Sequence, residues 1–435
     1  MSKQNNNNIN SSNKSTDGSL KAVNSPKDEA EKDIVRVSEP TILGPKEPER
    51  RKKRKPILII VLLIIIGIGA IAVYAIPAIM DSFNNTSENE DKDKDEDEDV
   101  EEVPENKNTT IVFDNVVTIN GSGAAAEGNN ITINAEGTYE VSGDTSNGSI
   151  TVNAPSKEVN IILSGTNIKC TSDAAIKVLN AATVTLTLKN GTENYLEDGG
   201  SSEYPSTIFS DSNLIINGTG TLEIKGNVKN GLSAKNSDVT VNSGKIKITA
   251  LEDGINAGGV ITINSGTIYI DATIYGINSG KNILINNGEI YVIGGSSAIT
   301  AGTNSEGIYQ INGGTVIGLA KNITILPDED SIIKTILFNL NQNIAEKDIF
   351  ALTDSKGKEI ISFEVNKDIK TISISTADIK DETYNLYSGV KHSGTTGYGI
   401  YPKGEITTGT KITIDNNSDF DLSATNNWFG SKNKS

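Results

Sequence analysis

The chain has 435 residues, with 39 Lys and Arg against 56 Asp and Glu, and it contains one Cys, one His and one Trp. A single cysteine excludes a disulfide scaffold and a thiolate metal cluster, and a single histidine argues against histidine-centred catalysis. Residues 1–80 carry 13 basic and 8 acidic groups, whereas residues 81–435 carry 26 basic and 48 acidic groups, so the two parts face different environments. All four arginines precede residue 55, so the acidic part is not expected to bind nucleic acid.

The N-terminal part is predicted to anchor the chain in a membrane. Residues 57–80 are 24 positions without a charge, and a helix needs only about 20 apolar residues to cross a bilayer. The Lys and Arg block at 50–55 is expected to stay cytoplasmic. Residues 1–56 are rich in Asn, Ser and Lys and predict a disordered cytoplasmic tail. An unusual signal peptide is the alternative interpretation, but such a long polar segment before the apolar run favours an uncleaved anchor.

Residues 81–106 form a strongly acidic segment, with 13 carboxylates and two lysines. Like charges repel one another and hold a chain extended, so this segment is predicted to be an extracellular linker. A calcium-binding run is the alternative.

Residues 107–322 contain an internal repeat, and the best-defined repeats are spaced 23, 22 and 22 residues. Three columns recur: Gly-Ile segments such as GINA and GINS, strands that end in Asn such as VTVN and ITIN, and Gly-x-apolar-x-apolar segments such as GKIKI and GTIYI. We call these the first, second and third columns. Three short alternating strands in each repeat, joined by Asn and Gly turns, are typical of a parallel β-helix.

Two sets of residues are assigned to structure within this helix. The Asn residues that end the second-column strands are predicted to form a hydrogen-bonded amide ladder, because Asn tolerates tight turns and stacks at strand spacing. The interior is predicted to be aliphatic. Its members are Ile246, Ile248, Ile268, Ile270, Ile290 and Val292, with Val241, Ile263 and Ile285 from the neighbouring strands.

The pattern changes after the repeat, and residues 323–435 are predicted to form a small β module with a polar tail. Longer strands are expected at 334–339, 349–353, 359–364 and 371–375. His392 lies in the Gly-rich segment KHSGTTGYG and is expected at the surface.

The repeats, together with the segments SDSNLIINGTGTLEIKGN (210–227) and SGKIKITALEDGINA (243–257), resemble the bacterial cell-surface carbohydrate-binding domain family. The stretch from IFALTDSKGKEIISFEV to DETYNLYSGV (349–390) is similar to the strand module that follows the helix in that family. The resemblance implies an all-β, right-handed, three-sheet parallel β-helix with a pectate-lyase-like fold. It also implies bound calcium and binding of plant cell-wall polysaccharides such as cellulose or polygalacturonate.

Calcium requires several oxygen ligands that converge at about 2.3–2.6 Å. Glu252 and Asp253 keep the acidic pair that family members carry before the Gly-Ile turn. With Asp211, and with Glu193 and Asp198 in the predicted ENYLEDGG turn, they are the candidate calcium ligands. Solvated turn carboxylates are the alternative interpretation at each position.

The alternation of the third column predicts an outward row that includes Tyr269 and Tyr291 on neighbouring coils about 4.8 Å apart. The two rings are expected to stack on a solvent-exposed face, flanked by Lys245, Lys247 and Glu289. We expect this surface to bind a polysaccharide. An aromatic pair that only stabilises the sheet is the alternative.

No acidic pair in the sequence shows a clear acid or base signature, and no arginine follows the predicted anchor, so binding is favoured over catalysis. The chain is therefore predicted to be a non-catalytic, single-pass, extracellular polysaccharide-binding protein of the cell membrane. The alternatives are a calcium-dependent lyase or hydrolase, and a structural spacer or adhesin.

Overall fold

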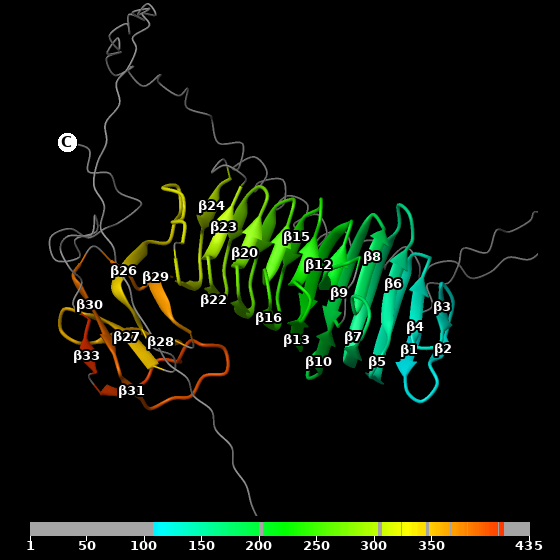
Figure 1. The fold of residues 1–435 in the computed structure, drawn as a ribbon, viewed down its shortest axis with the longest axis horizontal. Helices are drawn as coiled ribbons and strands as arrows, with labels where there is room; N and C mark the ends of the chain where they lie inside the picture. Colours follow the sequence, from blue (N-terminus) through cyan, green and yellow to red (C-terminus); the bar gives the residue numbers. More distant parts are fainter. Residues whose placement is uncertain are drawn as a thin grey trace, which may run out of the picture. The chain divides into compact units, whose positions relative to one another are not determined.

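The computed structural model describes residues 108–412 except 200–202, 303–306, 323, 345–347, 366, 381 and 408. Every regular element in this part of the chain is a β-strand. The strands form a parallel β-solenoid of about seven turns, followed by a smaller β module (Figure 1).

The predicted tail, anchor and acidic linker (1–56, 57–80 and 81–106) lie outside the described residues, as does the end of the polar tail. Within the described part, no helix has the length and apolarity that a membrane crossing needs.

Parallel pairing between successive coils produces the three predicted columns. The first column contains β4 (Asn130–Ile133), β6 (Ser149–Asn153), β8 (Ile176–Asn180), β11 (Ser206–Ser210), β14 (Asn230–Ala234), β17 (Ile255–Ala257), β20 (Tyr275–Ser279) and β23 (Ser297–Ala301). The second contains β9 (Thr183–Leu188), β12 (Asn213–Gly218), β15 (Val239–Val241), β18 (Ile261–Ile263), β21 (Ile283–Ile285) and β24 (Tyr309–Ile311). The third contains β10 (Glu193–Glu197), β13 (Thr221–Gly226), β16 (Lys245–Ala250), β19 (Thr267–Ala272), β22 (Glu289–Gly294) and β25 (Thr315–Ala320). The hand of the solenoid stays a prediction.

The N-terminal coils are less regular. Two long strands, β5 (Gly137–Thr145) and β7 (Glu158–Lys169), pair in parallel, and β7 then pairs with β9 through its first half and with β10 through its last three residues. The shorter strands β1 (Thr109–Phe113), β2 (Thr118–Asn120) and β3 (Ala124–Glu127) complete this end of the solenoid.

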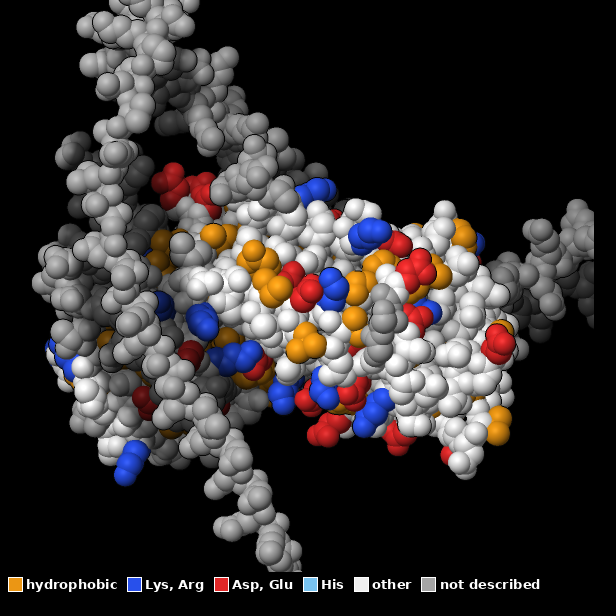
Figure 2. All heavy atoms as spheres, viewed as in Figure 1, with side chains coloured by type: hydrophobic (Ala, Val, Ile, Leu, Met, Phe, Trp, Pro, Cys, Tyr) orange, Lys and Arg blue, Asp and Glu red, His pale blue; other side chains and the backbone are white. Residues whose placement is uncertain are grey.

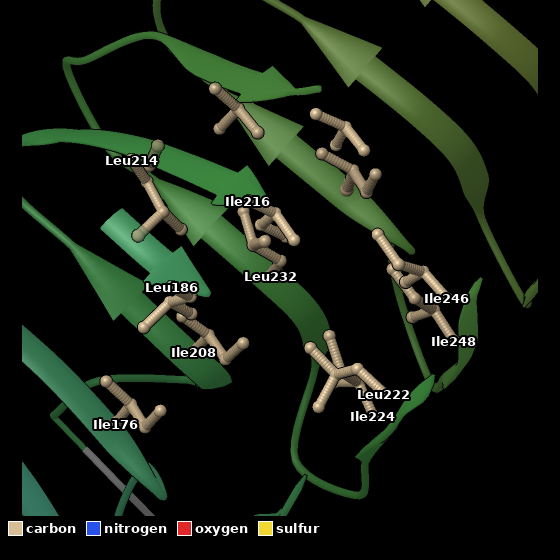
Figure 3. Close-up of a cluster of buried hydrophobic side chains, with 14 of the residues drawn as sticks. Ile176, Leu186, Ile208, Leu214, Ile216, Leu222, Ile224, Leu232, Ile246 and Ile248 are labelled. Carbon is tan, nitrogen blue, oxygen red and sulfur yellow. The ribbon is translucent and has the colours of Figure 1, made fainter. Parts of the chain in front are cut away.

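The solenoid interior is a continuous aliphatic core, as predicted. All nine residues assigned to the interior are at most 1% exposed, and Figure 3 shows Leu222, Ile224, Ile246 and Ile248 stacked on adjacent coils. Full burial of each such side chain contributes roughly 1.5–3 kcal/mol, so repetition of one inward pattern adds a favourable hydrophobic contribution with every coil.

The predicted amide ladder is confirmed. Four hydrogen bonds of 2.7–2.9 Å join the side chains of consecutive members, and in each the Nδ2 of the later coil donates to the Oδ1 of the earlier coil. The members are Asn217, Asn242, Asn264, Asn286 and Asn312. The glycine two residues after each of Asn242, Asn264 and Asn286 has φ between 118° and 121°, a backbone conformation that favours glycine.

The module that follows the solenoid contains β26 (Thr335–Ile344), β27 (Asp348–Asp354), β28 (Glu359–Val365), β29 (Ile369–Thr376), β30 (Tyr384–Ser388), β31 (Lys391–His392), β32 (Ile406–Thr407) and β33 (Thr410–Lys411). The four predicted strands correspond to β26–β29. Strand β29 pairs antiparallel with both β25 and β26, so the last solenoid coil is extended by a strand of the module. A second hydrophobic core lies between the module and this coil.

Candidate functional site

One outward row runs along the third column and its N-terminal extension. Strand register places its members directly beside one another in the order Asp144, Asn167, Tyr195, Glu223, Lys247, Tyr269, Tyr291 and Ile317. Neighbouring members are separated by about one strand spacing of 4.8 Å. The predicted register of the third column is therefore confirmed.

The two predicted tyrosines stack, with ring centroids 5.2 Å apart and planes 10° from parallel. The expectation of a solvent-exposed face is wrong for Tyr291, which is 0% exposed. Its hydroxyl donates a hydrogen bond to the backbone oxygen of Glu364 in the module, and this burial raises the pKa of Tyr291. Tyr269 is half-buried against the same second core. These two tyrosines are not solvent-exposed because the module covers this end of the row.

The predicted flanking residues do not form an open basic surface. Lys247 Nζ lies 3.4 Å from a carboxylate oxygen of Glu223, its neighbour on the row. Lys245, on the same strand as Lys247, and Glu289, on β22, are exposed. The structure thus brings Lys247, Tyr269 and Tyr291 together, but it does not make them one accessible glycan platform.

The other end of the row opens into a groove of about 690 Å³. It crosses β5, β7, β10 and β13, and its lining residues are Asp144, Gly165, Asn167, Lys169, Glu193, Asn194, Tyr195, Thr221 and Glu223. Figure 2 shows acidic and basic side chains mixed over the edge of the solenoid where β10 and β13 lie in Figure 1.

Tyr195 is the aromatic residue of this groove, and neighbouring side chains fix its ring. Lys169 Nζ lies 5.6 Å from the ring centroid, and the Tyr195 hydroxyl donates a 2.8 Å hydrogen bond to Glu197. Glu197 also accepts hydrogen bonds from Lys225 and Asn227. Burial opposes ionisation of Glu197, but these hydrogen bonds outweigh it and lower the pKa of Glu197 to about 2. Burial of Tyr195, together with its hydrogen bond to the charged Glu197, raises the pKa of Tyr195, so its hydroxyl stays protonated as a donor.

Asn194 shapes the floor of the groove. Its side chain is buried at 3% exposure, accepts hydrogen bonds from the backbone N–H groups of Gly165 and Thr166, and donates to the Thr221 carbonyl. Asn167 lies beside it, and its Oδ1 has no hydrogen-bond partner among the described residues. The groove therefore combines a fixed aromatic ring with a lining of polar and charged residues.

The sequence interpretation missed Tyr195 because it assigned ENYLEDGG to a turn. Residues Glu193–Glu197 are instead the strand β10. The turn before β10 has one residue more than its equivalent before β13, so Tyr195 is the fourth residue after Gly191, whereas Glu223 is the third after Gly220. Counting back from the hydrophobic Leu196 would have found the correct register.

The five candidate calcium ligands do not form one ligand set. Glu193 faces the groove, and Asp211 is exposed. Glu252 lies 3.3 Å from Lys229, and Asp253 accepts hydrogen bonds from the side chains of two asparagines. Asp198 is 1% exposed, and burial raises its pKa. Within the described residues, no group of three or more Asp, Glu, His or Cys is arranged to hold a metal ion, and calcium binding stays a prediction.

His392 is not the surface residue that its Gly-rich segment suggested. Its side chain is 0% exposed, with Nε2 3.3 Å from a carboxylate oxygen of Glu359. Its ring lies 4.6 Å from that of Tyr401, and its Nδ1 accepts a hydrogen bond from the Gly394 N–H. The histidine therefore belongs to the packing of the module.

The fold and its groove define the protein class as an all-β parallel solenoid with a polar and aromatic surface groove. Comparison with known sequences makes the assignment specific. The family model described as "Carbohydrate-binding domain-containing protein" matches residues 127–381, and the chain belongs to this family. The family resemblance predicted from the repeats is confirmed.

A similar protein from Acetivibrio thermocellus, also described as a carbohydrate-binding domain-containing protein, is 30% identical over 154 residues. The match covers 33% of this chain and 54% of that protein, so the chain spans about half the length of this relative. A solved structure described as a polysaccharide lyase-like protein from C. thermocellum, in a gadolinium derivative, has 23% sequence identity and a TM-score of 0.43. That match covers 50% of this chain and 96% of the solved one.

Proposed function

We propose that the chain is a non-catalytic polysaccharide-binding protein whose glycan site is the groove around Tyr195. The observation that carries this proposal is the fixed Tyr195 ring beside several polar groups in one groove. Binding sites combine an apolar or aromatic wall with a few placed polar groups, and a tyrosine offers both a ring face and a hydroxyl. Membership of the carbohydrate-binding family supports the same ligand class.

The charges of the groove favour a neutral glycan. Three carboxylates, of Asp144, Glu193 and Glu223, and one ammonium, of Lys169, line it. A polyuronate would bring further negative charge to this surface, and like charges repel. Of the two predicted polysaccharides, a cellulose-like glucan therefore fits the groove better than polygalacturonate does.

We also propose the cellular context from the sequence. The uncharged segment 57–80 and the basic block before it support a single-pass anchor with the N-terminus inside and the solenoid outside. In this arrangement the acidic linker extends between the membrane and the glycan-binding solenoid.

A glycoside hydrolase is the second candidate, because the carboxylates that line the groove are the groups that hydrolysis of a glycosidic bond requires. Among these carboxylates, Glu223 is engaged in an ion pair with Lys247.

The test is retention of the purified full chain on insoluble polysaccharides, with calcium or with a chelator, while the supernatant is assayed for released sugar. We expect retention on a neutral glucan without release, and we expect Tyr195→Ala to weaken it by about tenfold or more, as truncation of a central aromatic does in other interfaces. Tyr387→Ala, in β30 of the module, is the matched control and should retain normally. Released oligosaccharides would establish the hydrolase or lyase instead, and absence of retention would favour the spacer or adhesin.

A further inference from the structure

We infer that the outward face of the second column is a second binding site, which takes the surface of a solid, ordered, uncharged polysaccharide. This inference rests on the proposed function, because it takes a neutral glycan as the ligand. The two sites are separate, since no residue that lines the groove belongs to a second-column strand.

Strand register makes this face regular. Its central outward row is Thr185, Ile215, Thr240, Thr262, Leu284 and Gln310, and each member pairs directly with the next without a register shift. All members of the row are half-buried, as expected for side chains that touch their neighbours and stay open on the outer side. The five strand spacings give a length of about 24 Å, and four residue steps along each strand give a width of about 13 Å.

The second-column face is almost free of charge. The outward residues on both sides of the central row are Asn, Thr, Val and Ile, with Asp238 as the one ionisable residue among them. Asp238 accepts a hydrogen bond from the Val260 N–H through its Oδ1. The third column differs, because Glu223 and Lys247 lie side by side on its outward row. Covering a charge removes it from water at a cost, so the second-column face can be covered by a neutral solid with little penalty.

The amide ladder provides hydrogen-bonding groups at equal intervals along one edge of the face. An asparagine amide has two N–H donors and two acceptor lone pairs, and the ladder uses one of each on Asn264. One donor and one lone pair remain on this amide, and Asn264 and Asn286 are both exposed. The pattern repeats about every 4.8 Å. An ordered polymer with regularly spaced hydroxyls can therefore contact several coils at once, and many weak contacts add up to firm retention.

The module leaves this face open. The hydrophobic core that joins the module to the solenoid contains Tyr291 and Ile317 of the third column, but it contains no second-column residue. At the last coil, the Gln310 side chain donates a hydrogen bond to the Asp330 carbonyl, so the segment after β25 marks the end of the face. The face thus differs from the third-column row, which the module covers at the same end of the solenoid.

The experiment compares binding of the full chain to two forms of one neutral glucan, crystalline cellulose and soluble cellohexaose. Thr262→Lys places a long, charged side chain at the centre of the face. We expect its affinity for crystalline cellulose to fall by about tenfold, while its affinity for cellohexaose stays that of the wild type. Tyr195→Ala should weaken binding to both forms, because the groove takes a single chain from either.

Thr300→Lys is the matched control, since Thr300 is also a half-buried outward threonine but lies on β23 in the first column. It should bind both forms as the wild type does. Urea denaturation of all variants checks that the fold is kept, because an unfolded variant would lose binding for another reason. An equal loss on crystalline cellulose in Thr300→Lys would overturn the assignment to the second column.

The remaining outcomes separate the two proposals. If Thr262→Lys binds crystalline cellulose normally while Tyr195→Ala is weakened, the second-column face is not a site and the groove stands. If Thr262→Lys is weakened while Tyr195→Ala binds both forms normally, the groove is wrong and the face stands. A change from dimer to monomer in Thr262→Lys, measured by light scattering, would make the face a contact between copies of the chain instead. A wild type that binds neither form would overturn both proposals.

Discussion

Tyr195 and Tyr291 occupy the same outward row of the same column, yet one lines a groove and the other is fully buried. The partners of Tyr195 come from nearby coils of the solenoid. The partner of the Tyr291 hydroxyl lies 73 residues further along the chain, in the module. Equivalent positions in a repeat can therefore have different roles, and the element packed beyond the repeat decides which position stays available to a ligand.

The largest loss of stability is expected from a substitution of Tyr291, where the module covers the row. Tyr291→Ala removes a buried ring that stacks on Tyr269 and joins the solenoid to the module, so the free energy of unfolding should fall by about 3–5 kcal/mol. Urea denaturation would measure this loss. Tyr291→Phe is the matched variant and should lose about 1 kcal/mol, because only the hydrogen bond to the module is removed. Equal stability of all three proteins would show that the covered end is not packed as described.

A smaller effect is expected from the backbone contact that covers Tyr291. Gly399→Ala places a methyl group 2.6 Å from the ring at a φ of 81°, which should cost about 1–3 kcal/mol through overpacking and strain. Limited proteolysis should then cleave the module faster than in the wild type. Gly397→Ala is the control, because a Cβ there meets no described atom within 4 Å, and it should leave the cleavage rate unchanged.

The smallest loss of stability is expected at the groove, where Glu197 holds Tyr195. The pKa of Glu197 lies at about 2, below its ordinary value of 4.5, so its ionised form stabilises the fold above pH 4.5 and this contribution is lost as the pH falls towards 2. Between pH 5 and pH 3 the wild type should lose about 1 kcal/mol more than Glu197→Gln, after allowance for solvent screening. Parallel urea titrations at the two pH values would measure the difference, and identical losses would contradict the role of Glu197 in holding Tyr195.

The solenoid could be predicted from the sequence because the residue pattern that produces it is local to each strand and repeats in every coil. Alternation along strands such as Lys245–Ala250 identifies the inward residues, and the repeated asparagines identify a ladder that forms between equivalent positions. Stacking of identical side chains at strand spacing needs no knowledge of distant parts of the chain. The strands of the module do not repeat, but they were predicted because strand-forming runs such as Asp348–Asp354 are also local.

The candidate site was predicted less well, for two physical reasons. The solvent exposure of Tyr291 depends on where the module packs, which no repeat records. The position of Tyr195 depends on one additional turn residue before β10, and a shift by one residue reverses which face a side chain occupies. Both errors concern the same row. A correct register for β10 would have added Tyr195 to the row, but only the position of the module shows that Tyr291 is covered.

The amide ladder gives the solenoid a direction. In every step from Asn217 to Asn312 the donor belongs to the later coil and the acceptor to the earlier one. Because each polarised amide strengthens its neighbours, the dipoles of these side chains add along the solenoid axis instead of cancelling. A substitution in the middle of the ladder would therefore divide one long dipole into two shorter ones, and the electrostatic change would extend to asparagines that do not touch the altered residue.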